Sequence, residues 1–491
     1  MISFYLNGQP YHLDNLDPNL SILNWLRTNM RLTGTKEGCA SGDCGACTVA
    51  IGSPHPDGTL HYTTTNSCIS LIGSLHGKHL ITVDALQQQP PHPVQSAMIE
   101  EHGAQCGFCT PGFIMSLFAL HQNQQGQPAS EKDLLETLSG NLCRCTGYRP
   151  ILDAGRKAMV ETWTPGAADP KTQESAHPLQ APDMAGKLTA LANQPASIEA
   201  DSGAWYQVPT DLNALRDLRR QWPESRLIAG STDLALDITQ QLKTLPQLIS
   251  VERIPELLAI EDSADSLTIG AAATYESFRP ALSRLWPAFD PMLSRLGSRQ
   301  IRYRGTLGGN IGNASPIADM PPPLIALGAT LLLDGPEGER SLPLEEFFLD
   351  YKVTDLQPGE FIRSVSLLRP GPNEHLFIYK VSKRLDDDIS AVLGAFWLRL
   401  EQGAVTRCRL AWGGMAATPV RSPAAEQALT GKPWNEATIK TAGAALAGDF
   451  KPMSDARASA DYRRQVAANL LRRAWLSTQT PAQPVTVTDY A

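Results

Sequence analysis

The placement of the cysteines constrains this chain more than any other feature. Eight of its nine cysteines fall within the first 145 residues, in two sets. The first set reads Cys39-x4-Cys44-x2-Cys47 with Cys68 further on, and the second pairs Cys106-x2-Cys109 with Cys143-x-Cys145. The C-x4-C-x2-C run with one distant cysteine is typical of four thiolates that hold a [2Fe–2S] cluster. Two such sets predict a chain that moves single electrons between two metal centres.

The sequence around the first set favours a tight loop in a small sheet. Gly38, Gly42 and Gly45 alternate with the cysteines and allow the backbone to wrap a cluster with N–H groups near the sulfurs. Strands are expected at residues 2–6, 11–13 and 48–51. A helix is expected at 20–27, with Pro18 and Asn19 as its start signal. This pattern predicts a mixed sheet crossed by one helix, as in plant-type ferredoxins.

The second set sits among predicted helices. We expect an apolar helix at 113–120 just after Cys109, and a helix at 131–138 for which Ser130 is the N-cap. A further helix is expected from Pro150 to about Trp163, with the proline in its first turn. Helix N-termini favour thiolates, so the second set is predicted to lie at the helix ends of a small bundle.

Zinc and disulfides are the alternative uses of clustered cysteines. Structural zinc sites usually combine two C-x2-4-C pairs, from which both sets depart. The N-terminal residues Met1-Ile-Ser-Phe-Tyr5 lack the basic flank and apolar core of a secretory signal, so we expect a cytoplasmic protein with reduced thiols. Both alternatives are therefore disfavoured. Cys408, alone in an alternating apolar stretch, is predicted to be a core residue.

Bulk composition describes an ordinary acidic, multidomain protein. The chain has 491 residues, 42% of them hydrophobic, and a net charge of −8. This length suits three or four domains. The sequence shows neither a basic stripe for nucleic acid nor an apolar run long enough for a membrane span, so neither partner is expected. Residues 164–199 are rich in proline, alanine and polar residues and predict a linker, with a possible short helix at 184–191.

Two glycine-containing loops follow the linker. In the first, Leu227–Leu234, a strand-like lead ends at Gly230, Ser231 and Thr232, which can offer donors to a pyrophosphate. The second, Arg304–Asp319, adds Asn310, Asn313 and Ser315 as hydrogen-bonding side chains and Asp319 as an acceptor for a sugar hydroxyl. Neither loop is G-x-G-x-x-G, and a glycine loop of this kind, taken alone, is more often a simple turn. Beside two iron–sulfur sets they indicate a flavin, which can accept single electrons and pass on a hydride.

Taken together, these motifs resemble the molybdenum hydroxylase (xanthine oxidase) family over nearly the whole chain. The resemblance rests on residues 37–47, 105–112 and 141–149 and on the two glycine loops. It implies a multidomain α+β fold in five parts. These are a ferredoxin-like β-grasp domain at 1–85, a helical [2Fe–2S] domain at 86–163, the linker at 164–199, a vanillyl-alcohol-oxidase-type FAD domain at 200–370 and a small α/β domain at 371–480.

The resemblance also implies which residues hold the cofactors. The eight cysteines of the two sets would bind the clusters, and Gln105 matches a position that hydrogen-bonds the molybdopterin of an adjoining domain. The positions that match FAD-binding residues are Leu227, Ile228, Ala229, Gly230, Ser231, Thr232, Asp233, Leu234, Leu296, Thr306, Leu307, Gly308, Gly309, Asn310, Asp319, Ile362 and Lys380. Leu296 stands where animal members have an aromatic residue. Lys380 could stabilise an anionic reduced flavin. Alternatively, it could belong to a solvated basic patch whose charge is balanced by the aspartates at 386–388.

No molybdenum domain is recognised in this sequence, so the resemblance implies an electron-transfer subunit without catalytic residues for the substrate. Hypoxanthine or xanthine would be hydroxylated on a large partner subunit with molybdopterin, in an (αβ)2 heterotetramer. Electrons would then pass through the helical-domain cluster, the ferredoxin-type cluster and FAD to NAD+. Two alternatives stay open: the same architecture serving an aldehyde or N-heterocycle, and a free-standing ferredoxin-like carrier. The glycine loops and Lys380 disfavour the carrier.

Overall fold

The computed structural model describes residues 1–87, 91–124, 126–163, 179 and 183–479. The chain forms two compact units. The first unit comprises Met1–Pro255 and Gly297–Gly305, and the second comprises Glu256–Leu296 and the chain from Thr306 onward. Sheets and helical layers occur in both units, which confirms the predicted multidomain α+β fold.

The first unit begins with a mixed five-stranded sheet of order β2-β1-β5-β3-β4, in which β1 and β5 are parallel and the other pairs antiparallel. Alternate residues Ile2, Phe4 and Leu6 of β1 are buried, and the Phe4 ring meets Trp25 edge-on at 5.4 Å. The predicted ferredoxin-like sheet is thereby confirmed. Its strands are β1 (Ile2–Leu6), β2 (Gln9–Leu13), β3 (Thr48–Pro54), β4 (Leu60–Asn66) and β5 (His79–Ile81), and two 3-10 turns follow at η2 (Ile72–Leu75) and η3 (Val83–Leu86).

The helix predicted at 20–27 was placed two residues too early. The structure has α1 (Ile22–Asn24) followed by a π-helical turn, η1 (Trp25–Asn29). Ser21 is the N-cap, and its hydroxyl accepts from the Asn24 N–H at 3.1 Å. Asn19, the predicted start signal, exchanges two hydrogen bonds with the distant backbone of Leu245 instead.

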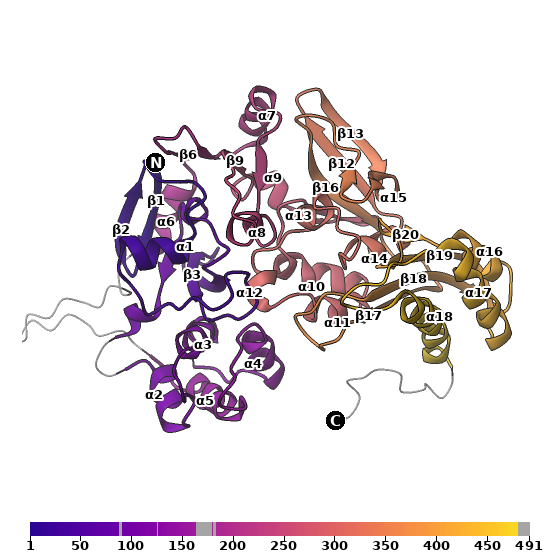
Figure 1. The fold of residues 1–491 in the computed structure, drawn as a ribbon, viewed down its shortest axis with the longest axis horizontal. Coiled ribbons are helices and arrows are strands. Elements are labelled where there is room, and N and C mark those ends of the chain that lie inside the picture. Colours follow the sequence, from indigo (N-terminus) through magenta and orange to yellow (C-terminus); the bar gives the residue numbers. More distant parts are fainter. Residues whose placement is uncertain (88–90, 125, 164–178, 180–182, 480–491) are drawn as a thin grey trace, which may run out of the picture. The chain divides into compact units, whose positions relative to one another are not determined.

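The helical part of the first unit packs as a bundle in which α2 contacts α5 (Figure 1). Helix α3 lies against β3 and β4. Ser130 caps the helix at 131–138 as predicted, accepting from the Asp133 N–H at 3.1 Å. The last helix ends at Met159 rather than Trp163, and the carbonyl of Glu161 lies 2.8 Å from His121 Nε2 instead of continuing the helix. The four helices are α2 (Pro93–Glu100), α3 (Thr110–Gln124), α4 (Glu131–Leu138) and α5 (Arg149–Met159).

Most of the predicted linker, residues 164–178 and 180–182, lies outside the described residues. The short helix expected within it is confirmed as α6 (Met184–Ala192), but residues 196–199 form β6, so the linker was drawn too long. Ala196 and Ile198 point inward and pair with β7, which makes this segment part of a second sheet of order β6-β7-β9-β8. The further elements of this region are β7 (Trp205–Val208), α7 (Leu212–Gln221), β8 (Arg226–Ile228), α8 (Leu234–Thr239), β9 (Gln247–Ser250) and α12 (Arg299–Arg302).

The second unit is built on an antiparallel sheet of order β10-β11-β16-β12-β13. Its core includes Leu267, Phe278, Leu331 and Val365, all fully buried. Its strands are β10 (Ile260–Asp262), β11 (Ser266–Gly270), β12 (Thr330–Gly335), β13 (Gly338–Pro343) and β16 (Phe361–Leu368), with a small pair β14 (Phe348–Asp350) and β15 (Val353–Thr354). The helices are α9 (Pro255–Leu258), α10 (Tyr275–Leu285), α11 (Phe289–Ser294), α13 (Leu307–Gly312), α14 (Pro321–Ala326) and α15 (Leu344–Phe347).

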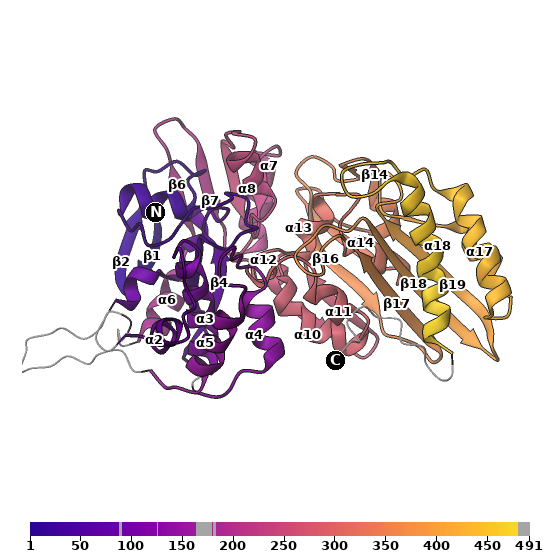
Figure 2. The ribbon, with the colours of Figure 1, turned by 60° about the horizontal axis from the view of Figure 1, so that its bottom comes forward.

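A four-stranded antiparallel sheet, β17-β18-β19-β20, completes the second unit, with α17 and α18 lying over one of its faces (Figure 2). Cys408 in β19 is 9% exposed within this core, as predicted. The elements are β17 (Glu374–Val381), β18 (Val392–Glu401), β19 (Ala404–Gly413), β20 (Val420–Arg421), α16 (Pro423–Leu429), α17 (Glu436–Asp449) and α18 (Ala460–Ser477). Within the described part of the chain, no helix combines the length and apolar character needed to cross a membrane.

Candidate functional site

The loop between η1 and β3 gathers the first cysteine set. Cys47 and Cys68 are buried, and their sulfurs lie 3.3 Å apart. Cys39 Sγ accepts from the backbone N–H groups of Ser41 and Cys44, each at 3.4 Å. Hydrogen bonds with the Cys44 and Cys68 thiols lower the pKa of Cys39, while the bond to Cys39 raises the pKa of Cys44. All four thiols are therefore within reach of one another.

Glycines allow this loop to close. Gly42 and Gly45 have φ of 85° and 68°, the left-handed region predicted for them. Gly38 is required for a different reason, because a Cβ there would lie 2.8 Å from Cys44 Sγ. The loop thus fits a compact sulfur-bound group, with backbone N–H groups directed at a cysteine sulfur.

The second set forms two contacting pairs at helix starts. Cys109 immediately precedes α3, and Cys143 and Cys145 lie just before α5. Burial and the Cys143 thiol raise the pKa of Cys109 to about 12, and a hydrogen bond with Cys106 raises the pKa of Cys145. Cys106 and Cys145 are exposed, unlike Cys47 and Cys68. The second set therefore faces solvent where the first is largely enclosed.

The donor sets suit clusters rather than one ion. Within the described residues, no group of three or more Cys, His, Asp or Glu side chains is arranged around a single metal ion. A [2Fe–2S] cluster takes two thiolates at each iron, and the pairs Cys109–Cys143 and Cys106–Cys145 match that demand. Gln105, predicted to meet molybdopterin, is exposed beside Cys106.

The first glycine loop connects β8 to α8 in the first unit. Gly230 is buried, and a Cβ on it would lie 1.7 Å from the carbonyl oxygen of Arg304, so this glycine serves internal packing. The Ser231 hydroxyl, predicted as a pyrophosphate donor, instead donates to the carbonyl of Ile69 at 2.7 Å. Any ligand bound here would therefore use the loop backbone and the less buried Thr232 and Asp233.

That hydrogen bond also joins this loop to the first cysteine set. Ile69 directly follows Cys68, and at the end of α8 the Gln240 amide donates to the carbonyl of Ala40 at 2.9 Å. Ser231 and Gln240 thereby tie the stretch 231–240 to the backbone next to Cys68 and Cys39. Sequence reasoning missed these contacts because the bonded residues lie 162 and 200 positions apart in the chain.

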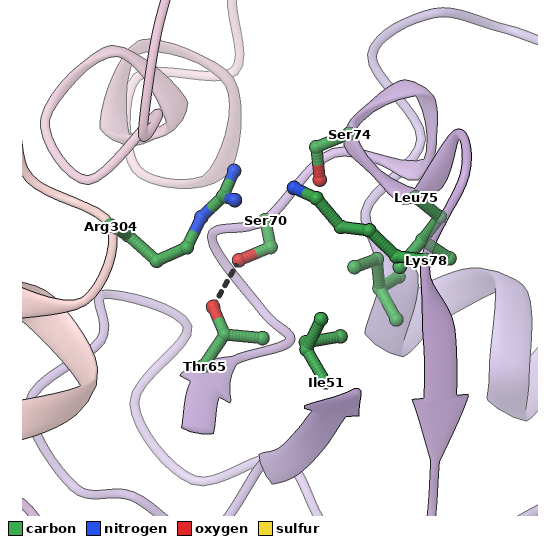
Figure 3. Close-up of a pocket in the computed structure, with 8 residues that line it drawn as sticks. Ile51, Thr65, Ser70, Ser74, Leu75, Lys78 and Arg304 are labelled. Atoms are coloured by element: carbon green, nitrogen blue, oxygen red, sulfur yellow. Dashed lines mark hydrogen bonds between the residues drawn. The ribbon is translucent and has the colours of Figure 1, made fainter. Parts of the chain in front are cut away.

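A small cavity of the first unit is lined by residues of β3, β4 and η2 and by Lys78 and Arg304 (Figure 3). Figure 3 shows Lys78 and Arg304 reaching the same space from different elements, with Thr65 hydrogen-bonded to Ser70 between them. Both cations bind Glu252, whose oxygens lie 2.7 Å from Lys78 Nζ and 2.6 Å from Arg304 Nη2. At about 10 Å³ the cavity has room for roughly one water and for no cofactor. The ion pairs of Glu252 with Lys78 and Arg304 hold the Arg304 side chain in place. The carbonyl oxygen of the same residue lies next to Gly230.

From Thr306 on, the second glycine loop belongs to the second unit and begins with the short helix α13 rather than a turn. Thr306 caps α13, accepting from the Gly309 N–H at 3.1 Å. Gly308 packs on Ala271, but Gly309 and Gly312 are exposed and leave the helix backbone bare. Asn310 Oδ1 is buried without a hydrogen-bond partner. An uncovered backbone beside an unsatisfied amide fits a bound polar cofactor.

Lys380 and Asp319, two predicted FAD positions, form a buried ion pair. Their charged atoms lie 2.6 Å apart, and the side chains are 2% and 8% exposed. The Ser390 hydroxyl lies 3.0 Å from Lys380 Nζ and donates to the other Asp319 oxygen at 2.5 Å. The reading of Lys380 as part of a solvated patch was therefore wrong, since its partner is Asp319 and not residues 386–388. Both Asp319 oxygens already accept from protein donors.

The remaining single positions are core residues. Leu296 and Ile362 are 7% and 8% exposed in the main core of the second unit. The Ile362 Cδ1 methyl lies 3.7 Å from where a Cβ on Gly312 would stand, which places Ile362 beside the bare face of α13. Leu296 supplies no aromatic ring for stacking.

Three family models match the chain. Residues 82–156 match a [2Fe-2S] binding domain, residues 197–369 match the FAD binding domain in molybdopterin dehydrogenase, and residues 377–478 match the CO dehydrogenase flavoprotein C-terminal domain. The FAD model spans both glycine loops. These matches agree with the cysteine geometry and with the cofactor fit of α13.

Whole proteins give the same picture. Xanthine dehydrogenase of Drosophila pseudoobscura pseudoobscura is 32% identical over 96% of this chain, and aldehyde oxidase 2 of Cavia porcellus is 31% identical over 100%. The chain spans only 39% and 41% of those relatives.

Two similar solved structures are carbon monoxide dehydrogenase from Hydrogenophaga pseudoflava and quinoline 2-oxidoreductase from Pseudomonas putida 86. Their TM-scores are both 0.53 at 27% and 28% identity, covering 57% and 56% of this chain and 96% and 97% of theirs. This chain therefore belongs to the molybdenum hydroxylase family, of which it carries the [2Fe–2S] and FAD-binding domains.

Proposed function

We propose that this chain is the electron-transfer part of a xanthine dehydrogenase. One observation carries the proposal: within the first unit, hydrogen bonds join the second cysteine set to the first, and the first to the loop 227–234. That connection gives an ordered electron path from an exposed end at Cys106 and Cys145 to an enclosed end beside the flavin segment. Bound FAD would supply the change from single-electron to hydride transfer.

The residues divide the work along this path. The eight cysteines would hold two [2Fe–2S] clusters, four at each. The backbone of 227–234 and the bare face of α13 at Gly309 and Gly312 would hold FAD. Each loop is proposed as an FAD-binding segment within its own unit, and the family model over residues 197–369 supports both assignments. Lys380 is proposed as a further FAD contact, made by an ammonium group whose charge Asp319 already balances.

Substrate chemistry would take place on a molybdenum-binding partner, at the exposed face around Gln105. We propose hypoxanthine and xanthine as substrates, NAD+ as the acceptor, a cytoplasmic location and an (αβ)2 assembly. The xanthine dehydrogenases among the relatives support the choice of substrate. The likeness to aldehyde oxidase, carbon monoxide dehydrogenase and quinoline 2-oxidoreductase supports, as the second candidate, the same path serving an aldehyde or N-heterocycle.

The test compares two reactions of the purified protein. NADH oxidation with a dye acceptor needs only the flavin end, whereas xanthine-dependent NAD+ reduction needs the partner and the whole path. Gln105→Ala should slow the second reaction and spare the first, while the exposed Gln221→Ala should change neither. Equal loss of both reactions in Gln105→Ala would contradict its proposed place at the entry side. If the unaltered chain shows no NADH–dye activity, the proposal that NAD+ is the electron acceptor is wrong.

A further inference from the structure

The two cysteine loops are joined by a single backbone hydrogen bond. The Leu142 N–H donates to the carbonyl of Cys44 at 2.9 Å. Leu142 directly precedes Cys143 of the second set, and Cys44 belongs to the first set. A short run of covalent bonds from Cys143 therefore reaches Cys44 through one hydrogen bond.

Asn141 clamps the backbone on both sides of this bond. It is 2% exposed. Its Nδ2 donates to the Gly45 carbonyl at 3.1 Å and to Thr48 Oγ1 at 3.3 Å. Its Oδ1 accepts from Ser116 Oγ at 2.7 Å and from Gln300 Nε2 at 3.0 Å. The amide thus uses both donors and both acceptor positions, which fixes its orientation and holds Leu142 next to Cys44.

Glycines make this approach possible. A Cβ on Gly45 would lie 2.1 Å from the Gly140 carbonyl oxygen, and one on Gly112 would lie 2.2 Å from the Gly45 carbonyl oxygen. Three chain segments therefore meet at backbone contact around Asn141. The packing leaves no room for a water between the two cysteine loops at these points.

We propose that Asn141 is a positioning residue that locks the two cysteine loops together and so maintains the Leu142–Cys44 hydrogen bond as an electron route between them. The proposal rests on the proposed function, in which each set holds one cluster. With clusters bound to both sets, one electron would pass along this route, from the second set, which would be oxidised, to the first, which would be reduced. No covalent bond forms or breaks. Tunnelling is more efficient through bonded atoms than across open gaps, so loosening the clamp weakens electronic coupling.

Hydrogen exchange and paramagnetic resonance on the full chain test the proposal. In Asn141→Ala, the amide of Leu142 should exchange at least about tenfold faster, because the network that holds its hydrogen bond is lost. The magnetic interaction between the two reduced centres should weaken in the same variant. Gln300→Leu leaves Asn141 in place but removes the Nε2 donor that Asn141 shares with Thr48 and Ser116. It should act in the same direction to a smaller extent.

Asn123→Ala is the matched control. The Asn123 side chain also joins a helix to a strand of the first sheet, accepting from the Tyr62 N–H at 3.0 Å and donating to its carbonyl at 2.7 Å. It touches neither cysteine loop in doing so. Leu142 exchange and the magnetic interaction should both stay at their original values in this variant.

Unchanged Leu142 exchange and unchanged magnetic interaction in Asn141→Ala and Gln300→Leu would overturn the proposal. An equal response in Asn123→Ala would also overturn it, since the effect would then be general loosening. If Asn141→Ala fails to fold, Gln300→Leu alone decides. Iron and sulfide analysis of the unaltered chain tests the proposed function separately. If that chain binds no clusters, the proposed function is wrong, while Leu142 exchange still tests whether Asn141 holds the two loops together.

Discussion

Lys380→Met tests whether the buried ion pair of the second unit depends on electrostatic compensation. Methionine keeps much of the side-chain length but removes the ammonium, leaving the buried Asp319 carboxylate with the Ser390 hydroxyl as its donor. Breaking a buried pair by removing one partner costs about 3–5 kcal/mol. The retained Ser390 hydrogen bond offsets about 1 kcal/mol of that. We therefore expect a loss of about 3 kcal/mol.

Hydrogen exchange of the β17 and β18 amides measures this loss. A single unfolding curve is unsuitable because a chain of two units does not unfold in two states. Arg384→Met is the control, since Arg384 and Asp388 form a 3.6 Å pair in which the arginine is 59% exposed. Such an exposed pair contributes about 0–1 kcal/mol.

The double variant Lys380→Met with Asp319→Leu refines the test. Replacing a buried pair by apolar side chains of similar volume is often close to neutral, so the double variant should recover most of the stability lost in the single. The reasoning fails if Lys380→Met destabilises the sheet no more than Arg384→Met. It also fails if the double variant is less stable than the single, because the pair would then act through packing.

Three further predictions concern the clusters, the flavin and acid stability. The chain should bind about four iron and four sulfide, and Cys44→Ser and Cys109→Ser should each remove one of two distinct paramagnetic signals; one signal type, or stoichiometric zinc, would contradict this. Gly312→Val, whose Cβ would meet only the Ile362 methyl at 3.7 Å, and Gly309→Val, whose Cβ would stand 2.9 Å from the capping hydroxyl of Thr306, should keep both clusters but lose flavin. Gly448→Val, with open space around it, should keep the flavin; normal flavin in all three would place the cofactor elsewhere. Burial opposes ionisation of Glu252, yet the charges of Arg304 and Lys78 lower its pKa from 4.5 to about 2. A lowered carboxyl pKa stabilises the folded state above the unfolded value, so this stability should fade as pH drops from about 4.5 towards 2. Glu252→Gln should remove that part of the acid sensitivity and leave the first unit less stable at pH 7, as checked by exchange in β5 and β9.

Local signals explain the parts that sequence reasoning predicted well. The helix at 131–138 begins where Ser130 can cap it, and a cap is decided within one turn of the chain. The cysteine spacing likewise predicts iron–sulfur ligation, because ligands close in sequence need only a loop to bring them together. The helix at 20–27 was misplaced since Asn19 bonds to Leu245, a partner 226 residues away.

The glycine loops and Lys380 show where local reasoning stops. Gly230 looks like a phosphate-loop residue, but its lack of a side chain is demanded by the Arg304 carbonyl. Lys380 lies near three aspartates in sequence, yet it pairs with Asp319, 61 residues away. Composition cannot reveal either fact, because burial and partner choice depend on which strands and loops pack together.

The sequence by itself determined the chemistry of this protein: eight cysteines at cluster spacing, a flavin-type pair of loops and the family to which they belong. Only the tertiary structure decided how those parts connect. Asn141 reaches Gly45 across 96 residues, and Ser231 reaches Ile69 across 162. Ligand identity is a property of residue types at short spacing, whereas an electron route depends on backbone contacts between distant segments, which form only when the sheets and helices have packed.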